Sequence, residues 1–190
     1  MKREMNKRKG QAGVRIIGGS LKRSKIEVLE RDGLRPTPDR VRETLFNWLM
    51  PAIPGATVID CFAGSGVLGL EALSRGASRC TFFEKDGVVA KQIEHNVARF
   101  QINSQAIITC ADVFHAPKDL FTEADIIFAD PPFHQGMSQD FLTWIRDKVQ
   151  PDSRLVIECE RDQDLGLQGF EVIKELKAGI DWLRLLRPTP

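Results

Sequence analysis

One stretch of the sequence, Thr57 to Ala77, constrains the fold more than any other. It opens with an apolar run, residues 58–62, that fits a buried parallel strand; a glycine-containing turn and a helical segment follow. Gly64, Gly66 and Gly69 have the G-x-G-x-x-G spacing of a nucleotide-binding turn, where missing side chains let a ligand and a helix approach the backbone. The stretch therefore predicts a strand–turn–helix unit that binds a ligand at its turn.

Asp60 narrows the choice of ligand. Its carboxylate ends the predicted strand, just before the turn. A dinucleotide would place its pyrophosphate on the N-terminus of the following helix, and a neighbouring carboxylate would repel that anion. A ligand that carries a positive charge and an ammonium group, and no phosphate, fits this position better.

The chain beyond this unit continues the alternation of strands and helices. Asp86 is expected to cap one helix, and residues 138–149 have the pattern of another. Only residues 177–179 separate the last two strands, which leaves no room for a crossover helix, so this pair is expected to be antiparallel. We therefore expect an α/β fold with an open, doubly wound sheet. The strands predicted after the first are 79–84, 106–110, 125–129, 154–159, 170–176 and 180–186.

The N-terminal quarter predicts a small extension of this fold. Two short strand-like pieces, Arg15–Ile17 and Lys25–Val28, flank a basic turn that contains glycine, so we expect a basic hairpin. A helix follows, for which Thr37 is a candidate cap and Pro38 suits the first helical position. Pro51 is expected to end that helix.

Charge is distributed unevenly along the 190 residues. Residues 1–50 hold 13 Lys and Arg against 6 Asp and Glu, whereas the remainder holds 14 against 20, and the two balances, +7 and −6, give the net charge of +1. Such an asymmetry favours a basic segment that meets a polyanion, attached to a mildly acidic body. For the first ten residues, a solvated terminal tail is an equally good interpretation.

The cysteines and the apolar segments indicate the compartment. Cys61, Cys80, Cys110 and Cys159 form no C-x-x-C pair, and each lies in or beside a strand-like run. This pattern favours buried free thiols in a reducing cytosol over disulfides or zinc ligands. No apolar stretch approaches the 18 or so residues of a membrane span, and the N-terminus lacks a signal-peptide core. We expect a cytoplasmic protein without a membrane partner.

Acidic residues follow four of the predicted strands: Asp60, Glu84, Asp112 and Asp130. In open α/β sheets, ligands bind beyond the carboxyl ends of the strands, so these carboxylates are expected to share one site. Glu84 can accept both hydroxyls of a ribose, because its spacing from the glycine turn is that of a ribose-binding acid. An ionised carboxylate only accepts hydrogen bonds, so Asp112 suits the exocyclic amine of adenine, and Asp60 suits a cationic amino-acid moiety.

The segment Asp130-Pro131-Pro132-Phe133 is the second informative motif. Two consecutive prolines make a stiff, extended turn whose backbone carbonyls lack local partners. Together with the Asp130 carboxylate they form a rigid set of acceptors for an NH2 group. Phe133 offers a flat face on which a base can stack, a contact worth roughly 1–3 kcal/mol. An ordinary proline turn with a core phenylalanine is the alternative.

The pairing of DCFAGSG with ADPPF resembles the class I S-adenosylmethionine-dependent methyltransferases that modify exocyclic amino groups. The closer resemblance is to the bacterial 16S ribosomal RNA guanine-N2 methyltransferases of the small subunit. It rests on RIIGGSLK (15–22), LRPTPDRVRETLFNWL (34–49), DCFAGSGVLGLEALSRGA (60–77) and DPPF (130–133). It implies a Rossmann-like, seven-stranded sheet in the order 3-2-1-4-5-7-6, with strand seven antiparallel.

The resemblance also implies a cofactor, a site and a reaction. The cofactor is S-adenosyl-L-methionine, which leaves as S-adenosyl-L-homocysteine, and no metal is implied. The base is expected to leave the RNA stack, lie against Phe133 and present its N2 amine to Asp130 and a proline-loop carbonyl. The expected catalytic loop is Asp130, Pro131, Pro132 and Phe133, and the expected cofactor pocket is Asp60, Phe62, Gly64, Ser65, Gly66, Glu84, Asp112 and Val113.

The expected partner is 16S ribosomal RNA, within the assembled or assembling small subunit, bound by a monomer. Basic residues of the N-terminal quarter are the candidates for contacting it, although for those near the first long helix, a fold-stabilising ion pair is nearly as good an interpretation. These candidates are Lys7, Arg8, Lys9, Arg15, Lys22, Arg23, Arg35 and Arg40.

The expected organisation is a flexible basic arm (1–13), a hairpin and helix extension (14–50) and a methyltransferase domain (51–190).

Three other functions compete with this one. Another amino-methyltransferase, acting on adenine N6 or on a protein glutamine, is disfavoured by aspartate rather than asparagine at position 130. An NAD-binding oxidoreductase is opposed by Asp60, and a catalytically silent RNA-binding protein by the complete set of acids.

Overall fold

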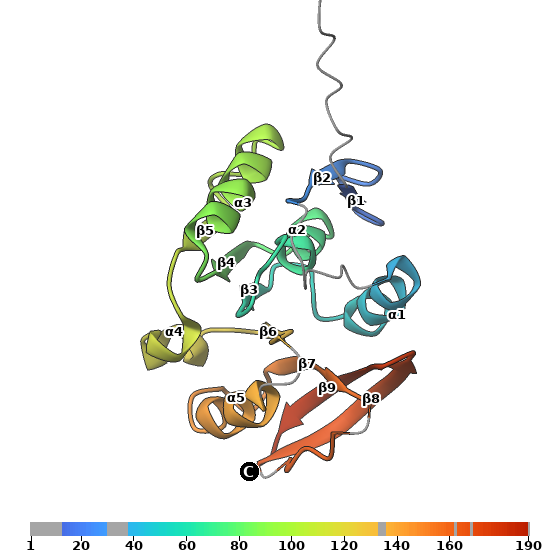
Figure 1. Ribbon diagram of the computed structural model, residues 1–190, viewed down its shortest axis with the longest axis vertical. Helices are drawn as coiled ribbons and strands as arrows, with labels where there is room; N and C mark the ends of the chain where they lie inside the picture. The colour runs from blue at the N-terminus through green and yellow to red at the C-terminus, as the bar shows by residue number, and fades with distance from the viewer. Residues whose placement is uncertain (1–12, 30–37, 133–135, 162, 168, 190) are drawn as a thin grey trace, which may run out of the picture.

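The computed structural model describes residues 13–29, 38–132, 136–161, 163–167 and 169–189. Their centre is a seven-stranded sheet in the order β5-β4-β3-β6-β7-β9-β8, with helices on both of its faces (Figure 1). This order is the predicted 3-2-1-4-5-7-6 arrangement. The sheet therefore confirms the α/β, doubly wound fold expected from the sequence.

Five neighbouring strands of the seven pair in parallel, β9 runs against them, and the outer strand β8 again points the same way as the five. Each parallel strand pairs in register with the next, whereas β9 is antiparallel to both β7 and β8. The carboxyl ends of the parallel strands and the first residues of β9 consequently share one edge. The strands are β3 (Thr57–Asp60), β4 (Arg79–Phe83), β5 (Ala106–Thr109), β6 (Ile126–Ala129), β7 (Arg154–Glu160), β8 (Phe170–Ala178) and β9 (Asp181–Pro188).

Two hydrophobic clusters lie on opposite faces of the sheet, because consecutive strand residues point to alternate sides. In β6, Phe128 belongs to the cluster beneath the first three helices, and Ile127 to the cluster beneath the later ones. The first face carries α1 (Asp39–Leu49), α2 (Val67–Ser74) and α3 (Gly87–Arg99). The second carries the short helices η1 (Val113–His115) and α4 (Lys118–Thr122), and α5 (Met137–Ile145).

The predicted hairpin is present as a separate two-stranded sheet, β1 (Gly13–Arg15) paired with β2 (Lys25–Glu27), although its first strand ends at Arg15 and does not reach Ile17. Ile16 and Ile26 are buried in the same cluster as α1, α2 and α3. The hairpin thus shares the core of the larger sheet. The division of the chain at residues 13 and 50 stays a prediction.

Buried polar side chains on α2 attach the hairpin. The fully buried Glu71 accepts hydrogen bonds from the backbone N–H groups of Ile17 (2.7 Å) and Gly18 (2.8 Å). Gly19 has φ +76°, and a Cβ there would lie 1.7 Å from the Ser74 carbonyl oxygen. The Gly-Gly pair of RIIGGSLK therefore allows the chain to approach the C-terminal end of α2.

A second attachment comes from α3. The buried amide of Asn96 accepts from the backbone N–H of Glu27 (3.1 Å) and donates to the carbonyl of the same residue (3.0 Å). One side chain thereby satisfies both backbone groups of a residue in β2.

Some local expectations were wrong. Helix α1 begins at Asp39, so Pro38 is its N-cap residue rather than its first helical residue, and Thr37 lies outside the described residues. Helix α5 ends at Ile145 rather than at residue 149, whereas Asp86 caps α3 as expected by accepting from Val88. All four cysteines are free thiols, but Cys110 is exposed. No helix in the described part of the chain is long and apolar enough to cross a membrane.

Candidate functional site

Asp60 ends β3 at the edge where the strand-end acids gather. Its side chain is 2% exposed, and Oδ2 accepts a hydrogen bond from the backbone N–H of Gly69 at 3.1 Å. Burial is the main reason that the pKa of Asp60 is raised to about 7; the Gly69 hydrogen bond lowers the pKa, and the nearby charges of Asp130 and Glu84 raise it. Three of the predicted acids, Asp60, Glu84 and Asp130, therefore lie close enough for the charges of the other two to act on Asp60.

Glu84 connects the glycine turn to the segment after β4. One of its carboxylate oxygens accepts from the backbone N–H of Gly64 at 2.9 Å, and the other accepts from that of Asp86 at 2.8 Å. Gly64 and Gly66 adopt positive φ angles of 50° and 74°, which favour glycine. The half-buried Glu84 carboxylate therefore lies beside the turn, and its ribose-binding role stays a prediction.

The third glycine of the motif has a different role. A Cβ at Gly69 would lie 2.2 Å from the Phe82 ring and 2.7 Å from Cys80 Sγ. Its missing side chain lets α2 pack directly on β4, which is the helix–strand contact expected of the last glycine in such a motif.

Asp112 and its neighbours form the next part of the edge. The Asp112 carboxylate caps η1 by accepting from the backbone N–H of Phe114 at 3.0 Å, and Val113 is buried. Phe62 is half-buried, with its ring edge-on to Phe114 and Phe141 at centroid distances of 6.3 and 5.5 Å. These aromatic and aliphatic side chains supply an apolar wall next to a carboxylate.

Asp130 follows β6 and is half-buried. Burial raises its pKa to about 7, and the negative charge of Asp181 contributes to the increase. Pro131 is buried and Pro132 exposed, whereas Phe133 lies outside the described residues. The stacking role of Phe133 therefore stays a prediction.

Two acids at this edge were missed by sequence reasoning. Asp181 is the first residue of β9 and pairs with Glu160 of β7; because β9 is antiparallel, its beginning lies at the carboxyl edge. Glu158 of β7 is 6% exposed. It follows Ile157, which pairs with Ala129 at the end of β6. The expected antiparallel hairpin was a usable signal for Asp181, whereas Glu158 is hidden within a strand.

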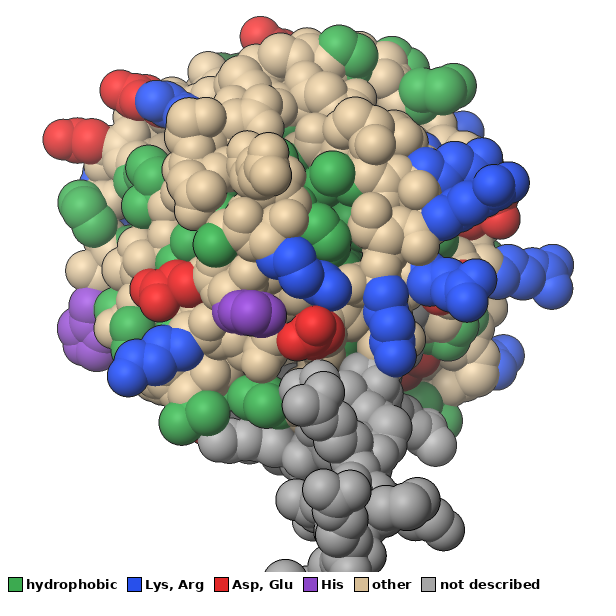
Figure 2. All heavy atoms as spheres, turned by 90° about the horizontal axis from the view of Figure 1, so that it is seen from above, with side chains coloured by type: hydrophobic (Ala, Val, Ile, Leu, Met, Phe, Trp, Pro, Cys, Tyr) green, Lys and Arg blue, Asp and Glu red, His purple; other side chains and the backbone are tan. Residues whose placement is uncertain are grey.

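The basic candidates are divided between the described and undescribed residues. Arg15, Lys22, Arg23 and Arg40 are exposed, and Lys and Arg side chains gather on the right-hand side of the view in Figure 2. Lys7, Arg8, Lys9 and Arg35 lie outside the described residues.

The turn that carries Lys22 and Arg23 lies against the C-terminal end of α2, where Leu21 N–H donates to Ser74 Oγ at 2.9 Å. Helix α2 begins at the glycine turn, so its other end points away from the acids. The structure thus separates these two cations from Asp130.

The acceptor-rich edge fits S-adenosylmethionine. Carboxylates at Asp60, Glu84 and Asp112 match its cationic, hydroxyl and amine groups, because ionised carboxylates only accept hydrogen bonds. Gly64 and Gly66 shape the turn through their positive φ angles, and the neighbouring acids disfavour a pyrophosphate. Within the described segments, no three His, Cys, Asp or Glu side chains are grouped to hold a metal ion.

Comparison with known proteins identifies the family of the chain. The family model described as Conserved hypothetical protein 95 matches residues 14–187. Ribosomal RNA small subunit methyltransferase D of Escherichia coli (strain K12) is 43% identical over 159 residues, covering 83% of this chain and 79% of that protein. The protein of the same name from Haemophilus influenzae is 40% identical over 179 residues, covering 90% and 92%.

Solved structures agree with the sequence matches. The putative methyltransferase yhhF from Escherichia coli is similar with a TM-score of 0.82 and 38% identity, covering 93% of this chain and 98% of that one. The fold is also shared with an RNA methyltransferase from Salinibacter ruber in complex with S-adenosyl-L-homocysteine, at a TM-score of 0.66 and 16% identity, covering 82% and 95%. The chain therefore belongs to the Conserved hypothetical protein 95 family, as a class I methyltransferase that uses S-adenosylmethionine.

Proposed function

We propose that the protein methylates the exocyclic N2 amine of a guanine in 16S ribosomal RNA of the small ribosomal subunit. The observation that carries this proposal is the placement of Asp130 and the two prolines at the end of β6, beside the cofactor edge. The relatives named small-subunit ribosomal RNA methyltransferases support the RNA as substrate. We further propose that the enzyme acts as a monomer in the cytoplasm.

We propose that the acidic side chains at the carboxyl edge of the sheet bind S-adenosylmethionine as hydrogen-bond acceptors. Glu84, already fixed by the N–H groups of Gly64 and Asp86, takes the ribose hydroxyls. Asp112 takes the adenine amine, with Val113 and Phe62 as the apolar wall, and Asp60 balances the positive charge of the amino-acid moiety. Gly64, Ser65 and Gly66 bring the backbone close to the ligand.

S-adenosylmethionine supplies an electrophilic methyl group when bound. The chain's contribution to the transfer is positioning: Asp130 and a carbonyl of the proline pair accept from the guanine N2 amine and turn its lone pair toward the methyl group. No strong base is needed before attack, because the nitrogen loses its proton once it is alkylated. Phe133 is proposed to hold the base by stacking.

A different amine remains the main competing substrate. Adenine N6 in a nucleic acid, or a glutamine side chain, presents the same NH2 group to Asp130. The basic N-terminal quarter and the names of the relatives favour ribosomal RNA.

The test uses tritiated S-adenosylmethionine with either free 16S RNA or small subunits isolated without the modification. Nucleoside analysis should find the label in N2-methylguanosine. Label in N6-methyladenosine or in protein would contradict the proposed substrate. A larger yield from subunits than from free RNA would support the subunit context.

A further inference from the structure

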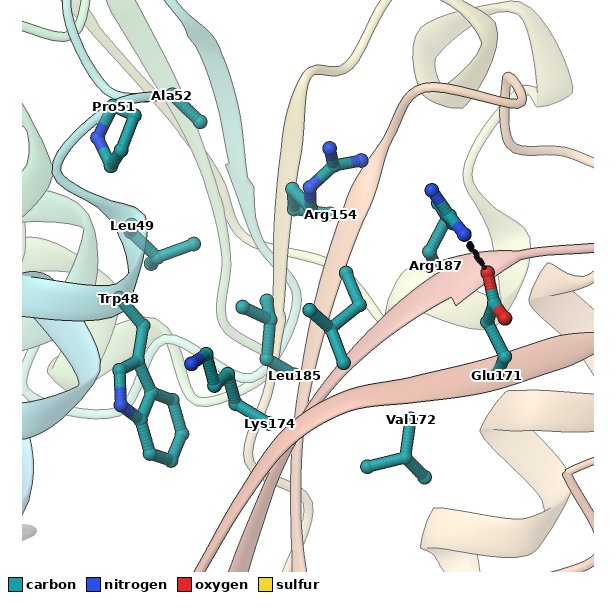
Figure 3. Close-up of a pocket in the computed structure, with 11 residues that line it drawn as sticks. Trp48, Leu49, Pro51, Ala52, Arg154, Glu171, Val172, Lys174, Leu185 and Arg187 are labelled. Carbon is teal, nitrogen blue, oxygen red and sulfur yellow. Dashed lines mark hydrogen bonds and ion pairs between the residues drawn. The ribbon is translucent and has the colours of Figure 1, made fainter.

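A groove lies between α1 and the outer strands, with a volume of about 480 Å³ (Figure 3). Helix α1 provides one wall and β8 with β9 the other. The residues that define it are Trp48, Leu49, Arg154, Lys174, Leu185 and Arg187.

The groove is at the opposite edge of the sheet from the acids. Arg154 is the first residue of β7, whereas Glu160, its last residue, pairs with Asp181 at the cofactor edge. Seven residues of strand span about 20 Å. The groove is therefore separate from the methyl-transfer site.

Its charge contrasts with that of the surrounding body. Three cations line the groove against one carboxylate, Glu171, which is paired with Arg187. Lys174 forms no ion pair with any residue that the structure describes, and Arg154 donates to the backbone carbonyl of Asp152 at 2.8 Å. Residues 51–190 carry 14 Lys and Arg against 20 Asp and Glu, so the net positive charge here is local.

An aromatic side chain lies next to these cations. Trp48 is half-buried, packs on the core and turns its indole toward the groove, with Lys174 on the facing wall in Figure 3. Phosphates bind Lys and Arg, and bases stack on aromatic faces, so this combination suits single-stranded nucleic acid.

The outer strand argues against a protein strand as the occupant. Its register shifts between Val172 and Lys174, where it pairs with β9. A bulge of this kind twists an edge strand away from regular pairing and discourages the addition of another strand.

We propose that the α1–β8 groove binds a second segment of the substrate RNA, with a base against Trp48 and phosphates at Arg154 and Lys174. This inference rests on the proposed function, and it specifies the substrate. The groove and Asp130 can be occupied together only by RNA that folds across the molecule, so a structured RNA or subunit is the preferred substrate over a short fragment.

The test is a charge reversal at the exposed Lys174, with Lys174→Glu compared with wild type. Lys91→Glu, an exposed lysine on α3, is the matched control. Filter binding to 16S RNA at several salt concentrations should show at least tenfold weaker binding for Lys174→Glu. The slope of log K against log salt should also be shallower for Lys174→Glu, by about the amount that one phosphate contact contributes. S-adenosylmethionine affinity should be unchanged, which verifies the fold.

A second variant tests stacking. Trp48→Leu should weaken RNA binding severalfold, and Trp48→Phe should restore it, because phenylalanine keeps an aromatic face. Methylation of a short RNA that contains the target guanine should be unaffected by Lys174→Glu, since such a fragment does not reach the groove.

Equal affinities and equal salt slopes for Lys174→Glu and Lys91→Glu would overturn the proposal. So would a wild-type dimer that Lys174→Glu dissociates, or a loss of subunit binding without any loss of RNA binding, since these would identify a second copy or a ribosomal protein as the occupant. The binding titrations need no methyl transfer, so a wrong target base would leave this test intact.

Discussion

The carboxylate of Glu84 is held by the backbone of Gly64, which donates its N–H at 2.9 Å across the glycine turn. The same side chain is the proposed ribose ligand, so it both shapes the turn and would bind the cofactor. Glu84→Ala is expected to weaken S-adenosylmethionine binding at least tenfold, about 1.4 kcal/mol, through loss of charge-assisted bonds. Isothermal calorimetry measures the affinity, and Glu94→Ala, on the exposed side of α3, is the control.

Unchanged affinity in Glu84→Ala would contradict the ribose role. Tight NAD binding by the wild-type protein would contradict the assignment of the whole edge.

Asp60 is expected to make the unliganded protein less stable as the pH rises. Its pKa is about 7 when folded and lies near 3.8 when unfolded, so between these values the folded state holds a proton that the unfolded state has lost. The stability that this group contributes is therefore complete below about pH 4 and declines up to about pH 7. Asp60→Asn should be more stable than wild type at pH 8, by up to about 4 kcal/mol, and no more stable at pH 4.

Urea unfolding at the two pH values measures this difference. The same measurement on Asp119→Asn, an exposed aspartate, is the control. An Asp60→Asn protein with the same stability gap at both pH values would disprove the titration of Asp60.

Asp130 is expected to set the pH dependence of methyl transfer. Its pKa of about 7 means that below neutral pH the side chain is a neutral acid, which is a weaker acceptor for the target amine than the carboxylate. At saturating S-adenosylmethionine, single-turnover rates should rise as the pH increases through 7 and then level off. Asp130→Ala should lower the rate on the order of 100-fold while cofactor affinity stays within a fewfold of wild type.

A rate in Asp130→Ala that still rises through pH 7 would assign the titration to another group. A proportional loss of cofactor affinity would show that Asp130 belongs to the cofactor pocket instead.

Glu71 is expected to hold the hairpin on the helical layer. Glu71→Ala leaves the N–H groups of Ile17 and Gly18 and the Arg75 guanidinium, bonded at 2.7 Å, without their acceptor. Removing one partner of such a buried pair typically costs about 3–5 kcal/mol. Hydrogen exchange should accelerate at residues 17 and 18, while the exposed Glu94→Ala leaves their exchange unchanged. Equal protection in both variants would mean that apolar packing alone attaches the hairpin.

The carboxyl edge of the sheet was predictable, because parallel strands deliver their ends to one side. Asp60, Glu84 and Asp130 were assigned to one site on this ground, and the interactions of Asp60 with Glu84 and Asp130 agree with it. The strand order and the antiparallel β9 were predicted as well, and both are confirmed.

The attachment of the hairpin was not predictable from local pattern. All eight residues of α2 are buried, so the helix has no polar, exposed face. The sequence pattern of the helix therefore does not indicate that Glu71 is buried and binds the hairpin. The backbone groups that Glu71 accepts from are 53 and 54 positions away, and no local periodicity reports such contacts. Other long-range contacts, from Ser20 and Leu21 to Ser74, place the turn with Lys22 and Arg23 at the C-terminal end of α2.

The close approach of α2 to β4 at Gly69 has a consequence for how variants of this enzyme are interpreted. A side chain at that position would collide with Phe82 and Cys80 in the core, whereas one at Gly64, where φ is 50°, would strain the turn that we propose to face the cofactor. A screen that scores only product would record both as losses of cofactor use. Soluble yield would separate them: the Gly69 variants would be depleted before any catalysis is measured.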